Sequence, residues 1–295
     1  MAEQNVKARF KIKPYRRVVQ LMVLGILVFI PMSSQNPTDW APSRIVLGQM
    51  PQPATFNFIG DTWSIAFNNF ELSHPLAFLD TWVSSNVIYL PLMVSALIPL
   101  ALTLLFGRIF CSWLCPVGFL LELNMKIRNV LQRFGIGWSY AFTDFRYLIL
   151  TVCLLMAFIL AIPVLSVIDP PHTLGRELMN FFTHHSVSLA GSSLLLGLVF
   201  LDTFIFSRTC CSKLCPSGGG LALMGKYRLL RIHMLKERCV ECSQCDEICP
   251  YQLSPMNLAI DRDFDWTKCD NCGLCRDICP TGAIEYNYRT NKQIK

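Results

Sequence analysis

Charged residues are scarce in this sequence, and several common functional motifs are missing from it. Only 16% of the 295 residues are Asp, Glu, Lys or Arg, whereas a typical soluble domain has about 25%. The sequence has no Gly-rich phosphate loop and no dinucleotide-binding fingerprint, which argues against a nucleotide-dependent enzyme. It has no C-x-x-C-H motif, so a c-type haem is not expected. The net charge of +6 is not gathered into a basic face, and no nucleic-acid partner is expected.

Apolar residues make up 53% of the chain, more than a soluble core would hide, so lipid is the expected solvent. Four apolar stretches lie at residues 18–32, 87–106, 147–168 and 187–206. They predict four transmembrane helices, because every backbone N–H and C=O group in lipid must be paired within the chain. The first stretch also resembles the apolar part of a signal peptide, but no convincing cleavage site follows it.

Basic residues determine the expected orientation of these helices. They gather before the first stretch, between the second and third, and after the fourth. Because cytoplasmic loops are enriched in Lys and Arg, both termini are expected in the cytoplasm. The expected location is therefore the bacterial cytoplasmic (inner) membrane, in a multi-pass arrangement.

Eight of the 14 cysteines lie between residues 239 and 279, in two C-x2-C-x2-C-x3-C-P runs. This spacing is typical of ferredoxins with two [4Fe–4S] clusters, in which the fourth cysteine of each run reaches the other cluster. The predicted ligands of cluster 1 are Cys239, Cys242, Cys245 and Cys279. Those of cluster 2 are Cys269, Cys272, Cys275 and Cys249. Structural zinc is the alternative, but zinc sites usually pair two C-x2-C units across a longer spacer.

A second cysteine motif occurs twice, as GRIFCSWLCPVG at 107–118 and SRTCCSKLCPSG at 207–218. Each copy follows an apolar stretch, so the repeat predicts two equivalent units that lie side by side. On a helix, the spacing of four puts both thiols of a copy on one face. Four thiols would then meet: Cys111, Cys115, Cys211 and Cys215. We expect them to hold a third metal centre or to act as redox thiols, and burial as small apolar side chains is the alternative.

Three other residues are candidates for catalysis. Asp202 lies inside the fourth apolar stretch, where it is either a proton relay or a carboxylate that reaches water at the helix end. His172 and Arg176 lie between the third and fourth stretches, where they would suit a quinone site. An ordinary polar turn built from Pro and Gly is the alternative for that segment.

The repeated C-x3-C-P motifs and the two four-cysteine runs together resemble the NapH/MauN family of ferredoxin-type membrane proteins. The resemblance implies a quinol dehydrogenase subunit with four spans. It would pass electrons from membrane quinol towards a periplasmic NapG- or MauM-like iron–sulfur protein or another redox subunit. A more distant similarity to the CcoG and NosR proteins implies the alternative of a copper reductase or a redox maturation factor.

The expected fold is an α-helical membrane protein with a C-terminal α+β domain of the bacterial 2[4Fe–4S] ferredoxin type. Its parts would be a basic cytoplasmic N-terminus at 1–17, a four-helix membrane domain at 18–228 and a cytoplasmic ferredoxin-like domain at 229–295. The expected cofactors are two [4Fe–4S] clusters, with an additional metal centre at the C-x3-C-P motifs. Quinol is the expected substrate, and membrane lipid and a redox subunit are the expected partners.

Overall fold

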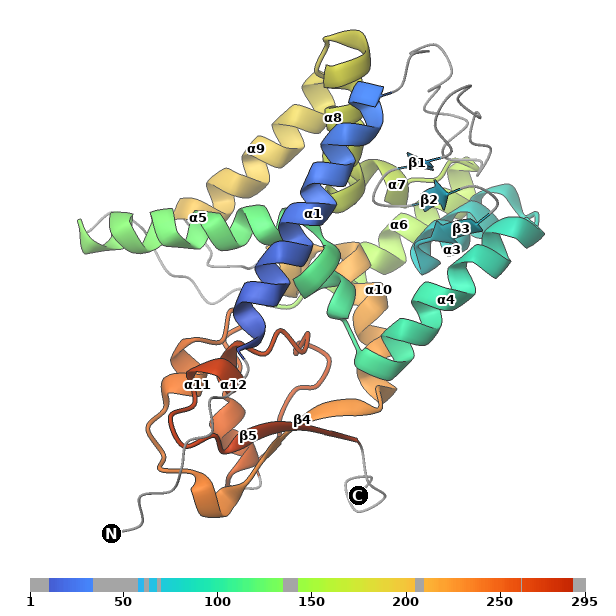
Figure 1. Ribbon diagram of the computed structural model, residues 1–295. Coiled ribbons are helices and arrows are strands. Elements are labelled where there is room, and N and C mark those ends of the chain that lie inside the picture. The colour runs from blue at the N-terminus through green and yellow to red at the C-terminus, as the bar shows by residue number, and fades with distance from the viewer. Residues whose placement is uncertain are drawn as a thin grey trace.

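The structure describes residues 11–33, 58–60, 64–67, 70–134, 143–204, 210–260 and 262–288. Figure 1 shows this computed structural model, in which a large helical part is joined to a smaller C-terminal part with two strands and short helices. Residues 1–10 of the predicted basic N-terminus lie outside the described residues.

All four apolar stretches contain a helix. These helices are α1 (Ile12–Ser33), α4 (Leu90–Phe106), α6 (Arg146–Leu160) and α9 (Leu189–Phe204), and the short α7 (Leu165–Ile168) follows α6. The described residues of the helical part also form helices outside the stretches: α3 (Pro75–Ser85), α5 (Pro116–Arg133), α8 (Pro170–His184) and α10 (Pro216–Met224). Each of these four begins with a proline, whose fixed φ suits the first helical position and whose missing N–H is not needed there.

The expectation of four transmembrane helices is wrong. Within the described ranges, no helix combines the length and the apolar character that crossing a bilayer demands. The helices α4, α6 and α9 have 17, 15 and 16 residues, whereas a span takes about 20. The 22-residue α1 carries basic side chains in its first turns. The stretches overestimate helix length because α4 begins only at Leu90, and because Ala161, with positive φ, stops α6 before the end of its stretch.

The two copies of the repeated motif are interlocked. In the first copy, α4 is followed by a π-helical turn, η2 (Phe110–Leu114), and then by α5. In the second copy, α9 is followed by η3 (Cys210–Leu214) and then by α10. Helix α5 packs against α9, and α10 packs against α4, so the helix after each motif contacts the helix before the other motif. The two copies therefore lie side by side, as the repeat predicts.

The remaining helices connect these copies to each other and to the C-terminal part. Helix α1 runs along α8 and reaches the C-terminal part, where it contacts α12 (Leu274–Ile278) (Figure 1). Helix α6 packs against α3 and α10. A small antiparallel sheet of β1 (Phe58–Gly60), β2 (Ser64–Phe67) and β3 (Phe70–Ser73) lies beside α4.

The C-terminal part is built on an antiparallel strand pair. After η4 (Gly225–Tyr227), β4 (Leu230–Met234) pairs with β5 (Ile284–Tyr288), and Met234 lies opposite Ile284. The connection contains η5 (Lys236–Arg238), α11 (Gln244–Glu247), η6 (Pro255–Leu258) and α12. The core of this part combines strand residues such as Ile232 with Cys245 and Cys275, so the cysteine loops are folded onto the strand pair.

Candidate metal centres

The structure brings Cys239, Cys242, Cys245 and Cys279 together around one pocket. Cys239 and Cys242 lie between η5 and α11, Cys245 lies in α11, and Cys279 follows α12. The rest of the lining is largely apolar and includes Met234, Met256 and Ile284. The backbone N–H of Ala283 donates to Cys279 Sγ at 3.3 Å, a contact that suits a thiolate. These are the four cysteines that the spacing assigns to cluster 1.

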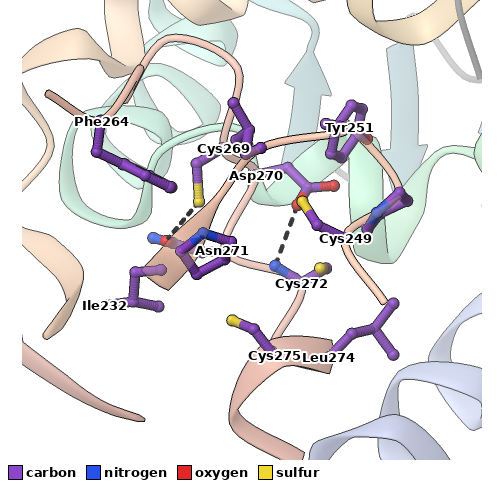
Figure 2. Close-up of a pocket in the computed structure, with 14 residues that line it drawn as sticks. Ile232, Cys249, Tyr251, Phe264, Cys269, Asp270, Asn271, Cys272, Leu274 and Cys275 are labelled. Atoms are coloured by element: carbon purple, nitrogen blue, oxygen red, sulfur yellow. Dashed lines mark hydrogen bonds between the residues drawn. The ribbon is translucent and has the colours of Figure 1, made fainter. Parts of the chain in front are cut away.

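A second pocket is lined by Cys249, Cys269, Cys272 and Cys275, the residues assigned to cluster 2 (Figure 2). Three of them belong to the second run, and Cys249 reaches this pocket from the first run. Cys245 of the first pocket and Cys275 of the second share one hydrophobic core. The two pockets are therefore neighbours, which short-range electron transfer between two clusters requires.

The two cysteine runs share an uncommon backbone pattern. In each run, the residues just before and just after the second cysteine have positive φ: Glu241 and Ser243 in the first, Asn271 and Gly273 in the second. Only one of these four is a glycine, so the other three adopt a conformation that L-residues rarely take. These left-handed residues curl each loop tightly, and three cysteines of the run then lie along the concave side.

One buried thiol in each pocket holds its proton tightly unless a metal takes the place of that proton. Burial raises the pKa of Cys249 to about 11 and, together with Asp246, the pKa of Cys245 to about 12. Free thiols there keep their protons, whereas bound metal stabilises the thiolate form. Within the described part of the chain, no three His, Cys, Asp or Glu side chains converge on a point that could hold a single ion. Cysteines around a four-iron cube stand at its corners instead, so the donor set fits a [4Fe–4S] cluster.

The two C-x3-C-P motifs have the same local geometry. Cys115 and Cys215 are the N-caps of α5 and α10, with ψ of 117° in both, and each Sγ accepts an N–H three residues on, from Gly118 or Gly218, at 3.4 Å. The proline after the second cysteine of each motif begins the next helix, α5 or α10. The two cysteines of a motif therefore do not lie on one regular helix.

The four thiols of these motifs nevertheless lie near one another. Cys111 and Cys211 line the same pocket, and Cys115 shares a hydrophobic cluster with Cys211. Burial raises the pKa of Cys111 to about 11 and also raises the pKa of Cys115 and Cys215, and the neighbouring thiols add to each shift. We name this group, Cys111, Cys115, Cys211 and Cys215, the four-thiol site.

The four-thiol site adjoins the second ferredoxin-like pocket. Tyr251 and Asp270, which line the pocket of cluster 2, also line the pocket that contains Cys111 and Cys211. Ser112 Oγ donates to Asp270 O at 3.1 Å. The C-x3-C-P turns are thus in direct contact with a loop that carries cluster 2 cysteines, although these segments are about 160 residues apart in the sequence.

The other predicted residues lie in different places. Asp202 is buried between α5 and α9, where Asn124 Nδ2 donates to its carboxylate at 3.3 Å and Arg128 Nη1 donates to its backbone oxygen at 3.0 Å. His172 and Arg176 lie one turn apart on α8, so the interpretation of this segment as a polar turn is wrong. His172 is buried, whereas the Arg176 side chain remains partly accessible and is 4.0 Å from Glu177.

Sequence reasoning did not identify a buried polar group around His172. Burial lowers the pKa of His74 to about 4 and raises the pKa of Asp80 to about 6. The nearby His172 makes a smaller electrostatic contribution, which lowers both pKa values. Asp80 accepts the backbone N–H groups of Leu165 and Ser166 at the start of α7, at 3.4 and 3.1 Å. Asp169 accepts the Cys215 thiol at 3.8 Å, so this polar group extends to the four-thiol site. The available signal was the His-Pro and Asp-Pro pairs before α3 and α8, a typical way to begin a helix.

Comparisons with known proteins agree with this geometry. A family model described as a 4Fe-4S binding domain matches residues 89–134 and again residues 188–234, the two halves that hold the repeated motif. A second model with the same description matches residues 263–285. No solved structure matches the chain.

Several curated proteins are similar to this chain. The methylamine utilization ferredoxin-type protein MauN of Methylobacillus flagellatus is 28% identical over 80% of this chain and 74% of its own length. The ferredoxin-type protein NapH of Escherichia coli is 26% identical over 63% of each chain. The putative electron transport protein YccM of Escherichia coli is 30% identical over 58% of this chain and 49% of its own.

The cysteine pockets and the matched models define an iron–sulfur electron-transfer protein. The similarity to MauN and NapH proteins over most of the chain supports a place in the NapH/MauN group of ferredoxin-type proteins.

Proposed function

We propose that this chain exchanges electrons between quinol and a redox partner protein through two [4Fe–4S] clusters and a third centre at the four-thiol site. The observation that carries the proposal is the crossed arrangement of the cysteines. Cys279 completes the pocket of the first run, and Cys249 completes the pocket of the second. This exchange of fourth ligands is the arrangement of two-cluster ferredoxins.

The positions of the three centres support a linear route. The cluster 1 site reaches the surface, because Cys242 is exposed, and it is the natural contact point for a partner protein. The cluster 2 site is more deeply buried, with Cys269 and Cys275 both buried. It lies between the cluster 1 site and the four-thiol site. When bound, the clusters supply one-electron chemistry, and the chain supplies the ligands, the burial and the spacing.

Quinol is the proposed electron donor in the helical part. Oxidation of a quinol to a quinone releases two electrons and two protons, so the site needs an electron acceptor and a base. The four-thiol site would take the electrons one at a time, and the buried group around His172 would take the protons. Similarity to NapH and MauN supports a NapG- or MauM-like iron–sulfur protein as the partner.

The surface of the helical part supports a location at the bacterial inner membrane. Large apolar side chains are exposed on several helices, among them Leu90 of α4, Ile159 of α6 and Leu196 of α9. Exposed apolar surface of this extent marks a binding face, and quinols dissolve in lipid, so we propose that this face contacts lipid. Cell fractionation tests this: detergent but not high salt should release the chain from membranes, and recovery in the soluble fraction would contradict it.

Metal analysis tests the cluster assignment. Anaerobically purified protein should contain about eight iron and eight sulfide ions per chain for two clusters, and about twelve of each with a third. Substitution of Cys272 by Ser should remove about four irons. The double change Cys111→Ser and Cys211→Ser should return a count of twelve to eight. Cys153→Ser is the matched control, because Cys153 is a buried thiol that packs in the helical core. An iron-free, colourless wild-type protein would refute the proposal.

Reduction kinetics test the donor. A soluble quinol analogue should reduce the clusters of the wild-type protein, and His172→Gln should slow this reaction while dithionite still reduces the clusters fully. His233→Gln in β4 serves as the control. Clusters that quinol leaves oxidised would exclude quinol as the donor without affecting the cluster assignment.

A further inference from the structure

Three fully buried arginines surround one short segment of the ferredoxin-like part. Arg108 Nη1 donates to Thr267 O at 3.0 Å, and Arg146 Nη2 donates to Thr267 Oγ1 at 2.9 Å. Arg228 donates to Trp266 O at 2.6 Å and to Cys269 O at 2.7 Å. Their exposed fractions are 1%, 1% and 0%. We name this set, Arg108, Arg146 and Arg228, the arginine clamp.

The clamp joins the helical part to the loop that begins the second cysteine run. Arg108 lies between α4 and η2, Arg146 begins α6, and Arg228 lies between η4 and β4. Two of them also stack on aromatic rings of the C-terminal part, Arg108 on Tyr251 at 5.5 Å and Arg228 on Trp266 at 5.4 Å. The fold leaves space for them: a Cβ on Gly107 would lie 2.4 Å from Arg228 Nη1. Each guanidinium is therefore held in place from several sides.

Positive charge exceeds negative charge around the cluster 2 pocket. Arg146 is 3.3 Å from Asp144, Lys268 lies within 4 Å of Asp144 and Asp265, and Asp270 lies in the pocket lining. Three carboxylates therefore face three guanidinium groups and one ammonium group. On the adjoining side, Arg16 and Arg17 share the single carboxylate of Glu122 at 2.7 Å. Burying a cation is costly unless a negative charge compensates for it. A [4Fe–4S] cluster with four thiolates carries net negative charge and would supply this compensation.

The cluster 1 pocket has the opposite surroundings. Cys245 Sγ lies 3.6 Å from the carboxylate of Asp246, and Glu247 follows in the same short helix. Cys242 is exposed to solvent. Nearby carboxylates oppose the additional electron that reduction brings, whereas nearby buried cations favour it.

We propose that the arginine clamp raises the reduction potential of cluster 2 above that of cluster 1, so that an arriving electron settles at the cluster 2 site beside the four-thiol site. The inference rests on the proposed clusters and extends their function. Transfer between the sites moves one electron, from a reduced [4Fe–4S]+ cluster 1 to an oxidised [4Fe–4S]2+ cluster 2, and no proton or bond changes. Cluster 2 is then reduced first, whichever end of the route supplies the electron.

The wild-type protein provides the first test. An EPR-monitored redox titration of the iron-loaded chain should resolve two midpoint potentials. Cys242→Ser identifies cluster 1, because an oxygen ligand changes the signal of that cluster alone. The higher potential should belong to the cluster that Cys242→Ser leaves unchanged. Equal potentials, or a higher potential at cluster 1, would overturn the inference, whereas absence of iron would refute the proposed function instead.

Charge-changing variants provide the second test. Coulomb's law with an effective dielectric constant of about 20 and a separation of about 10 Å gives roughly a tenfold change in the reduction equilibrium per charge. For a one-electron couple this equals about 59 mV. Arg228→Gln should lower the cluster 2 potential by about this amount. The cluster 1 potential should change by no more than about a fifth of that shift. Arg228→Lys keeps the positive charge, so its cluster 2 potential should stay much closer to the wild-type value than that of Arg228→Gln.

Matched control variants distinguish the effect of the lost charge on the potentials from the effect of damage to the fold. Arg128 is also fully buried but donates to Asp202 O and Thr203 O in the helical part, so Arg128→Gln should leave both potentials unchanged. If the Arg228→Gln protein loses iron, the Arg146→Gln protein is titrated instead, because Arg146 contacts Thr267 rather than a cysteine. Equal shifts in the Lys and Gln variants would show that contact geometry, not charge, sets the potential, and would overturn the inference.

Discussion

Replacement of Asn271 should loosen the ferredoxin-like part from the helical part. Its side-chain amide donates to Phe106 O at the end of α4, at 2.7 Å, and to Leu230 O at the start of β4, at 3.0 Å. Its backbone oxygen accepts the Tyr286 hydroxyl at 2.8 Å. The residue is only 5% exposed. One side chain therefore ties together a helix end, a strand start and the second cysteine run.

The magnitude follows from the two side-chain hydrogen bonds. Asn271→Gly keeps the positive φ of 56° without strain but removes both donors. Each lost bond to a buried carbonyl costs about 1–2 kcal/mol, so the free energy of unfolding should fall by about 2–4 kcal/mol. Asn271→Asp should cost more, because a carboxylate oxygen then faces two carbonyl oxygens and repels them.

Anaerobic urea titration of the iron-loaded protein measures both effects through tryptophan fluorescence and visible cluster absorbance. The control is Asn257→Asp, since the Asn257 amide makes an exposed bond of 3.4 Å to Asp263 O and should cost less than about 0.5 kcal/mol. If Asn271→Asp proves as stable as Asn271→Gly, the amide does not act as a donor to these carbonyls, and the reasoning fails.

Three other changes test separate parts of the fold. Glu122→Gln removes the carboxylate that two arginines of α1 share and should lower the urea-measured free energy of unfolding by about 3 kcal/mol; a loss below about 1 kcal/mol would contradict a buried ion pair. Gly118→Ala should destabilise more than Gly218→Ala, because the added Cβ would lie 2.6 Å rather than 3.0 Å from the carbonyl of the first cysteine in its motif; equal losses of melting temperature would disprove this. Burial raises the pKa of Asp80 from 3.8 to about 6, so the folded state binds this proton more tightly than the unfolded state. Its contribution, about 3 kcal/mol, is fully present below about pH 4 and is lost as the pH rises through about 6; Asp80→Asn should abolish this part of the pH dependence, and an unchanged pH profile would refute it.

Local spacing predicted which cysteines lie around a common pocket. Two-residue spacers keep successive cysteines close together in space. The grouping of Cys239, Cys242 and Cys245 therefore follows from the sequence. The crossing of Cys249 and Cys279 was also predicted, because the fourth cysteine of such a run ligates the other cluster in two-cluster ferredoxins. The structure places both sets of four around separate pockets.

Helix boundaries were predicted less well. Apolar runs showed where helices occur, but the runs continue past residues such as Ala161, where the backbone turns and α6 ends. A polar turn was the alternative for the segment that contains Pro170, whereas Pro170 begins α8 and Pro116 likewise begins α5. A proline is compatible with both positions, and only the packing of the following residues distinguishes them.

The sequence by itself determined the number and grouping of the C-terminal thiols and the existence of two equivalent C-x3-C-P units. Only the tertiary structure decided how short the helices are and that the helix after each motif packs against the helix before the other motif. It also decided that Arg108, Arg146 and Arg228 meet at one loop. The physical reason is the separation of the interacting residues along the sequence. Short spacers restrict which thiols can share a centre, whereas the hydrogen bond from Arg228 to Cys269 O joins residues 41 positions apart. No periodicity records such a contact, because it exists only once the two parts of the chain have packed together.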